Sequence, residues 1–296
     1  MIYNVRHTTH YTYSKPVDLA AHLLHLLPRC CEWQSVLSEK LTVTPDLARR
    51  VDRLDHFGNR VTWLFLDRAH GDFEVTSESV IDVRPLTHPD PAATPDWETV
   101  RQAGAQGGAA TWQAAEFRFE SPMAPLVAGA RDYAAPSFAP GRPILAALMD
   151  LNERMFQDFT FRSGVTSVST PIQRVLETRQ GVCQDFTHLM LSAIRGLGLP
   201  ACYTSGYIRT RPPPGKPRRR GSDQSHAWVG AWLGPEHGWV GLDPTNGVVV
   251  RDEHVMVALG RDFSDISPVR GMLLGGGKHT LQVGVDLEPA EPPMQA

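Results

Sequence analysis

The segment that begins at Gly181 constrains the fold of this chain more than any other stretch of its 296 residues. Its apolar side chains recur every three to four residues, which is the spacing of a helix that buries one face. These apolar positions are Val182, Phe186, Leu189, Met190, Ala193, Ile194 and Leu197. The helix should end near residues that do not continue helices, Gly196, Gly198 and Pro200. The spacing therefore predicts a core helix with Cys183 in its first turn.

Strand-like runs follow this helix, and helical runs precede it. We expect strands over 201–208, 226–233 and 238–242, with the last two joined as a hairpin. Helical spacing predicts a second helix over 144–159. A further helix should begin behind Pro171, since proline suits the first position of a helix. This arrangement of helices and strands predicts an α+β fold.

The chain divides by composition into four parts. Residues 1–85 hold short strand-like runs broken by turn residues, and we expect a small antiparallel β domain there. Residues 86–140 begin with a stretch rich in Pro, Ala and Gly, which indicates a linker or loosely packed connecting segment. Residues 141–287 form the expected core together with its C-terminal strands, and the Pro-rich tail 288–296 should be disordered.

Composition also bears on partners and location. The formal net charge of -3 and the pI near 6.5 give no reason to expect nucleic acid or an anionic membrane as a partner. No run is long and apolar enough to span a bilayer, and the N-terminus lacks the apolar stretch of a signal peptide. Four cysteines in a chain this long do not make a disulfide framework. We therefore expect a cytoplasmic protein with reduced thiols, and its oligomeric state stays open.

Cys183 is the candidate nucleophile. A free cysteine is most often a small buried apolar side chain, so the residue type alone proves little. The context favours catalysis, because a helix N-terminus stabilises a thiolate and Gly181 permits the tight turn before it. A His and an Asp also follow on expected strands, as thiol acyl transfer requires.

His226 is the best candidate base among the twelve histidines. It begins an alternating strand on which Trp228 shares its face, so the indole could wall the site. The alternative is a core histidine whose hydrogen bonds are satisfied locally. His188 is a poor base, because five residues along a helix turn it roughly 140° away from Cys183.

Asp243 ends the third expected strand, where its carboxylate could accept a hydrogen bond from His226 and fix the tautomer of the imidazole. It could equally be an Asp that opens the turn at 243–246. The oxyanion site would come from the backbone N–H of Cys183, with the Gln184 side chain as a weaker candidate for substrate contact.

No metal or cofactor is expected. The pairs His7/His10 and His22/His25 have an offset of three, which sends side chains on a strand to opposite faces. No nucleotide-binding glycine loop is present. The Arg- and Pro-rich segment 209–220 is most simply a solvated loop, although a position beside the site would favour acidic substrates.

Several motifs together resemble the bacterial transglutaminase-like superfamily, the thiol proteases with an N-terminal β domain. They are TRQGVCQDFTHL at 178–189, SHAW at 225–228, GLDPTN at 241–246, GRDFSDISP at 260–268, YTYSKPV at 11–17 and DHFGN at 55–59. The resemblance covers nearly the whole chain and implies a papain-like core with Cys183 as nucleophile, His226 as base and Asp243 as orienting carboxylate. The segment around 103–110 and the Arg-rich loop have no place in the family pattern.

The leading hypothesis is a thiol-dependent peptidase or amidase that acts on amide bonds of peptides or proteins. An amine acceptor in place of water would make the same three residues a transglutaminase. Relatives of this core also include deglycosylating amidases and inactive binding modules, so a non-catalytic peptide-binding module is the third possibility. The sequence alone does not separate these activities.

Overall fold

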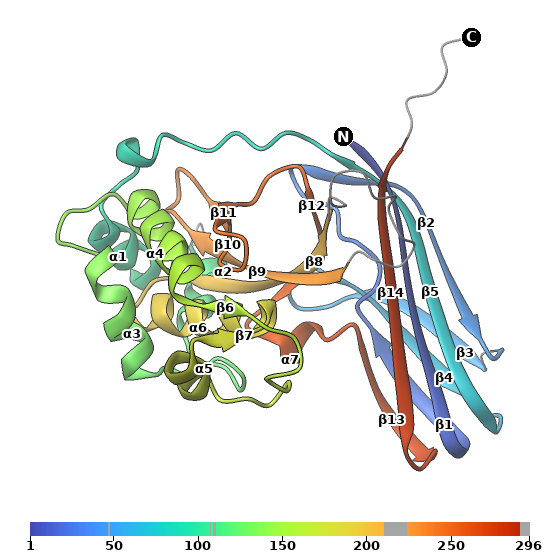
Figure 1. Cartoon of the computed structure of the whole chain (residues 1–296). Coiled ribbons are helices and arrows are strands. Elements are labelled where there is room, and N and C mark those ends of the chain that lie inside the picture. The colour runs from blue at the N-terminus through green and yellow to red at the C-terminus, as the bar shows by residue number, and fades with distance from the viewer. Residues whose placement is uncertain (47, 107, 109–110, 210–223, 291–296) are drawn as a thin grey trace, which may run out of the picture.

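The computed structural model describes residues 1–46, 48–106, 108, 111–209 and 224–290. A long, bent antiparallel sheet built around the N-terminal strand stands beside a core in which helices cover one side of a smaller sheet (Figure 1). These two parts together confirm the expected α+β fold with an N-terminal antiparallel β domain.

The first sheet is organised around one strand, β1 (Ile2–Leu24), which runs through its centre. Its side chains alternate between buried and exposed over the first half, as expected of a strand with one face on a core. The strands of the N-terminal region are in the order β2-β5-β1-β4-β3. Their bounds are β2 (Gln34–Thr44), β3 (Arg49–Leu54), β4 (Arg60–Leu66) and β5 (His70–Val83).

The last two strands of the chain also belong to this first sheet. β13 (Val269–Gly275) and β14 (His279–Pro289) both pair antiparallel with β1. The sequence assigned them to the core unit, and the structure differs because pairing partners so distant in the chain leave no local signal. Residues 288 and 289, expected in a disordered tail, are part of β14, and 291–296 lie outside the described residues.

The core sheet has five antiparallel strands in the order β11-β10-β9-β8-β12. They are β8 (Ala201–Ile208), β9 (Gln224–Trp232), β10 (Trp239–Asp243), β11 (Val248–Val249) and β12 (His254–Gly260). The expected hairpin is present as β9 and β10, and β12 adds to the sheet at its β8 edge.

Helices pack on the core sheet. The expected helices are α4 (Ile144–Asp158), α5 (Ile172–Thr178) and α6 (Cys183–Gly196). Short elements beside them are β6 (Thr160–Phe161), β7 (Gln180–Gly181) and α7 (Phe263–Ile266). The apolar side of α6 enters the same core as Ala227 and Val229 of β9, so the helix that begins at Cys183 is fixed to the sheet.

The segment 86–140 is more ordered than expected. It forms α1 (Trp97–Gln106), α2 (Trp112–Ala115) and α3 (Ala128–Ala134), with the short 3-10 turns η1 (Pro91–Ala93), η2 (Glu116–Arg118) and η3 (Ala135–Ser137). Val100 and Phe117 are buried in this segment. Gly104 is so close to Pro200 that an added Cβ would lie 2.9 Å from the ring. Small residues pack closely here, so the segment lacks the regular spacing of large apolar residues by which a helix is recognised in a sequence.

The two sheets share one hydrophobic core. Tyr3 and Val5 of β1, Ile81 of β5 and Leu287 of β14 belong to the same buried cluster as the apolar face of α6. The N-terminal sheet therefore completes the core rather than forming a separate appendage.

Two buried amide side chains also join the N-terminal sheet to the edge strand β12. Gln34 donates to the carbonyl of Met256 at 2.7 Å and accepts from its N–H at 2.8 Å. Asn59 makes the same pair with Leu259, donating at 2.7 Å and accepting at 2.9 Å. Each amide pairs with β12 as a neighbouring strand would, which satisfies backbone groups at the edge of the core sheet.

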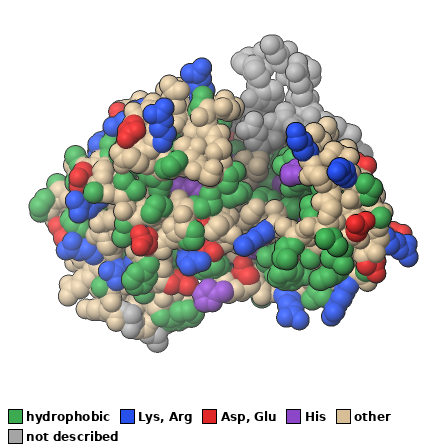
Figure 2. All heavy atoms as spheres, turned by 90° about the horizontal axis from the view of Figure 1, so that it is seen from below, with side chains coloured by type: hydrophobic (Ala, Val, Ile, Leu, Met, Phe, Trp, Pro, Cys, Tyr) green, Lys and Arg blue, Asp and Glu red, His purple; other side chains and the backbone are tan. Residues whose placement is uncertain are grey.

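The outer face of the N-terminal sheet carries exposed apolar side chains. Viewed from below, they gather on the side of the molecule that this sheet forms (Figure 2). Leu19, Trp63, Phe65, Met272 and Leu274 share this face, because β1 pairs Leu19 with Leu274 and sets Ala21 opposite both Phe65 and Met272. The opposite face of the same strands is buried.

No helix among the described residues has the length and apolar character that a membrane span requires.

Candidate active site

Cys183 lies at the first position of α6, and the local sequence explains how it is held there. Asp185, in the first helical turn, accepts a hydrogen bond from the N–H of Val182 at 2.8 Å and another from the Thr166 hydroxyl at 2.6 Å. A Cβ at position 181 would lie 2.9 Å from this carboxylate, so glycine is required at that point. The thiol is half-buried at a helix N-terminus, where the helix dipole favours negative charge.

His226 meets Cys183 from the start of β9. Its imidazole interacts with the thiol of Cys183, while Nε2 lies 2.7 Å from Oδ2 of Asp243. Because Nε2 faces the carboxylate, Nδ1 is the nitrogen left for the thiol. Burial alone would lower the pKa of His226, but the bonds to Asp243 and Cys183 outweigh burial and raise that pKa to about 10.

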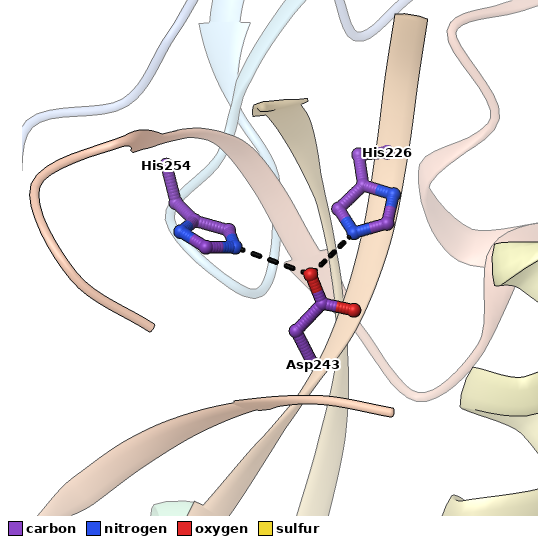
Figure 3. A group of neighbouring side chains, drawn as sticks. All are labelled: His226, Asp243 and His254. Atoms are coloured by element: carbon purple, nitrogen blue, oxygen red, sulfur yellow. Dashed lines mark hydrogen bonds and ion pairs between the residues drawn. The ribbon is translucent and has the colours of Figure 1, made fainter. Parts of the chain in front are cut away.

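Asp243 combines the two roles that the sequence left open. Its Oδ1 accepts hydrogen bonds from the N–H groups of Thr245 and Asn246 at 3.0 and 3.2 Å, which makes it the residue that opens a turn. Its Oδ2 faces His226 (Figure 3). Burial would raise the pKa of Asp243, but the hydrogen bonds from His226 and His254 lower it, so the carboxylate is charged.

His254 is a member of this cluster that the sequence did not identify. It begins β12, and its Nε2 lies 3.3 Å from the same Oδ2 of Asp243 that His226 contacts (Figure 3). The ring is buried and lies edge-on to Trp228, with centroids 5.2 Å apart. No local pattern marks His254, because it reaches Asp243 only through the position of β12 in the sheet.

Three donor atoms of His226, Asp243 and His254 lie within 4.8 Å of one another, the distance range of a metal site. However, the nitrogen–oxygen distances of 2.7 and 3.3 Å match hydrogen bonds, and the Asn246 side-chain amide also donates to Oδ2 at 2.7 Å. A bound metal would have to replace all three hydrogen bonds that His226, His254 and Asn246 make to this one oxygen. The arrangement fits a carboxylate held by hydrogen bonds better than a metal site.

The other predicted site residues have different surroundings. Gln184 is half-buried next to Cys183. Trp228 is only 2 % exposed and packs with Val250 and Met256, and its ring lies against those of His226 and His254, so little of the indole is open to a substrate. His188 is turned away, as expected, and its Nε2 accepts a hydrogen bond from the N–H of Phe263.

The remaining cysteines lack the surroundings of Cys183. Cys202 is buried in β8, where burial raises the pKa of its thiol to about 11. Burial also raises the pKa of Cys31, and Cys30 is exposed. The basic loop predicted over 209–220 lies outside the described residues except for Arg209, whose N–H bonds the carbonyl of Glu253.

Comparison with known proteins agrees with this architecture. Residues 3–82 match the family model of the bacterial transglutaminase-like N-terminal region, and residues 131–244 match that of the transglutaminase-like superfamily. The protein Rv2569c of Mycobacterium tuberculosis is 40 % identical over 98 % of this chain and 93 % of its own length. The protein ML0607 of Mycobacterium leprae is 29 % identical over 96 % of this chain and 97 % of its own.

A solved structure shares the fold of the whole chain. The crystal structure of a "Putative Cysteine Protease" from Cytophaga hutchinsonii superimposes with a TM-score of 0.74 at 19 % identity, and the match covers 98 % of this chain and 92 % of that one. The sequence relatives and the family models together establish the relationship that the motifs indicated. The chain belongs to the transglutaminase-like superfamily and carries the bacterial transglutaminase-like N-terminal region.

Proposed function

We propose that this protein is a thiol-dependent acyl-transfer enzyme, a cysteine peptidase or amidase that cleaves amide bonds of peptides or proteins. The observation that carries the proposal is the contact series from the Cys183 thiol to His226 and from His226 to Asp243. Such a series couples a nucleophile to a proton carrier and to a group that orients the carrier.

In the first half-reaction, Cys183 and His226 act as a thiolate and imidazolium pair. The thiolate attacks the amide carbonyl carbon, forming a C–S bond while the π electrons move to the oxygen. The tetrahedral intermediate then expels the amine, which takes the proton from Nδ1 of His226. The acyl group is left on Cys183 as a thioester.

In the second half-reaction, neutral His226 removes a proton from water as the water oxygen attacks the thioester. Collapse of this intermediate breaks the C–S bond, releases a carboxylic acid and restores the thiolate and imidazolium. Asp243 keeps Nε2 protonated through both steps, so that Nδ1 always carries the transferred proton.

Negative charge on the carbonyl oxygen would be stabilised at the start of α6. The first amides of a helix have no intrahelical partner, so the N–H of Cys183 can donate to the oxyanion. The Gln184 side chain is the second candidate donor, because it stands on the same first turn.

The four unpaired thiols are consistent with a cytoplasmic location, where cysteines are kept reduced.

The test uses intact-mass analysis of peptides incubated with the purified protein. Peptides with internal amide bonds and glutamine side chains are compared with and without a primary amine, and Cys183→Ala is the control. We expect mass changes of hydrolysis that require Cys183. Incorporation of the amine would instead identify a transglutaminase, and no turnover of any peptide would favour a non-catalytic binding module.

A further inference from the structure

One oxygen of Asp243 accepts hydrogen bonds from three side chains, and the mechanism above uses only His226. We propose that His254 is a positioning residue that holds Asp243 toward His226, and that Gln34 of the N-terminal sheet fixes the strand that carries His254. This inference rests on the proposed function, because it assigns a role within the same site. It also gives the N-terminal sheet a part in the chemistry.

The first step of the argument is the orientation of the Asp243 carboxylate. The turn amides of Thr245 and Asn246 fix Oδ1, and the side chains of Asn246 and His254 hold Oδ2 in line with His226. His254 approaches Oδ2 from β12, across the sheet from His226 on β9 (Figure 3). Because a carboxylate oxygen only accepts, Nε2 of His254 carries the proton, and its bond holds Oδ2 between the two rings.

The second step is that His254 is itself held in place. Its ring is 3 % exposed, and it lies edge-on to the buried ring of Trp228 at an interplanar angle of 76°. Its Nδ1 is buried without a hydrogen-bond partner among the described residues. A buried nitrogen without a partner carries a cost, so the bond from Nε2 to Asp243 is the polar contact that justifies a histidine at this position.

The third step connects His254 to the N-terminal sheet. β12 is the edge strand of the core sheet, and Gln34 pairs with both backbone groups of Met256, two residues beyond His254. Trp33, next to Gln34, packs against the cluster formed by Trp228 and Met256. The N-terminal sheet thus fixes the strand and the indole that support His254.

Among the described residues, the ionisable side chains that act most strongly on His226 are Cys183 from α6 and Asp243 from β10. Those that act most strongly on Asp243 are His226 and His254. The Asn246 side chain adds a neutral donor. Loss of His254 therefore leaves Asp243 with a less directed bond to His226, and the Cys183 thiolate with a weaker counter-ion.

The test measures the rate constant for alkylation of Cys183 by iodoacetamide at about pH 6, where ordinary thiols are mostly protonated. This readout needs no substrate. His254→Leu removes the donor, and His254→Gln keeps a donor near the position of Nε2. His22→Leu is the matched control, because it removes another buried imidazole, one that stacks on Phe73 in the N-terminal sheet. Thermal melts establish that each variant is folded.

We expect His254→Leu to lower the rate constant roughly tenfold to a hundredfold, as misplacement of a catalytic group does. His254→Gln should recover most of the loss, and His22→Leu should match the parent. A folded His254→Leu protein with the parent rate constant would overturn the proposal. If parent Cys183 reacts no faster than the exposed Cys30, the proposed function itself fails, and this inference fails with it.

Gln34→Leu tests the connection to the N-terminal sheet, with Asn59→Leu as its matched control. Both changes remove an amide pair with β12, but Leu259 lies further from His254 than Met256 does. We expect Gln34→Leu to lower the rate constant in the same direction as His254→Leu, and by more than Asn59→Leu. Equal rate constants for Asn59→Leu and a folded Gln34→Leu would remove Gln34 from the proposal.

Discussion

His22 in the N-terminal sheet and His226 in the core are both buried imidazoles, but their surroundings differ. His22 stacks on Phe73 with centroids 4.1 Å apart, and neither ring nitrogen has a hydrogen-bond partner among the described residues. Burial lowers its pKa to about 4. His226 touches Asp243 and Cys183, and its pKa is raised to about 10. Burial alone makes an imidazole neutral, whereas a buried carboxylate in contact with the ring keeps it protonated.

The same contrast separates the two regions as a whole. In the N-terminal sheet, buried polar side chains join structural elements: His7 bonds Tyr207 of β8 at 2.8 Å, and Gln34 and Asn59 pair with β12. In the core, buried polar side chains surround one charged carboxylate, Asp243. One region supplies support, and the other supplies the charge that the proposed chemistry needs.

Removal of the N-terminal region should have the largest effect. Deleting residues 2–85 takes away the partner strands of β13 and β14, the apolar residues that β1 and β5 add to the shared core, and the amides on β12. We expect an insoluble or aggregated protein, because this much apolar surface cannot stay exposed. Size-exclusion chromatography checks it. A monodisperse, fully active fragment would show that the core does not need the first sheet.

Within the core, loss of Cys183 or His226 should abolish turnover. Cys183→Ala removes the atom that forms the thioester, and His226→Ala removes both the counter-ion and the proton carrier. The measurement is peptide turnover by folded variants. A folded His226→Ala protein with the parent rate would contradict the site.

Asp243→Ala should have a smaller effect on turnover. The carboxylate orients His226 but does not react, so a roughly 10- to 1,000-fold loss with a measurable remnant is expected. Thermal melts must accompany this rate, because Asp243 also anchors the turn at Thr245 and Asn246. Parent activity in the folded variant would reduce Asp243 to a turn residue.

The smallest predicted effect concerns stability at acidic pH. The pKa of His22 is about 4 in the folded protein, below the 6.5 of a free imidazole, so the unfolded chain takes up a proton first as pH falls. The neutral His22 ring therefore contributes fully to the free energy of unfolding above about pH 6.5, and this contribution is lost as pH falls toward 4. The free energy of unfolding of His22→Leu, relative to that of the parent, should therefore rise by about 2 kcal/mol when the pH is lowered from about 7 to about 5.

Urea denaturation at the two pH values checks this prediction. Replacement of the exposed His279 by Gln is the control for loss of a histidine outside the core. A His22→Leu protein whose stability follows the parent at both pH values would show that His22 is not neutral in the fold.

The sequence predicted the elements whose signals are local. Strand β8 was predicted with the bounds that the structure gives, and α4 was predicted within one residue at each end. α6 was predicted with Cys183 in its first turn, because large apolar residues recur there at helical spacing. Motif order also singled out Cys183, His226 and Asp243, which the structure brings into contact.

The sequence did not predict what depends on pairing between distant segments. β13 and β14 return to β1, and the register of that pairing is a property of the assembled sheet. His254 was not identified for the same reason, since β12 joins the sheet beside β8 and not beside its neighbours in the chain. The small helices of 86–140 were missed because Gly and Ala pack there in place of large apolar residues.

The most direct test of the comparison is an NMR titration of the histidine rings. Imidazole nitrogen shifts report protonation without any substrate. We expect His226 to stay protonated until the pH approaches about 10, and His22, His7 and His188 to stay neutral until the pH falls to about 4. In Asp243→Ala, His226 should lose its proton at a much lower pH. A parent His226 that is already neutral at pH 7 would contradict the account.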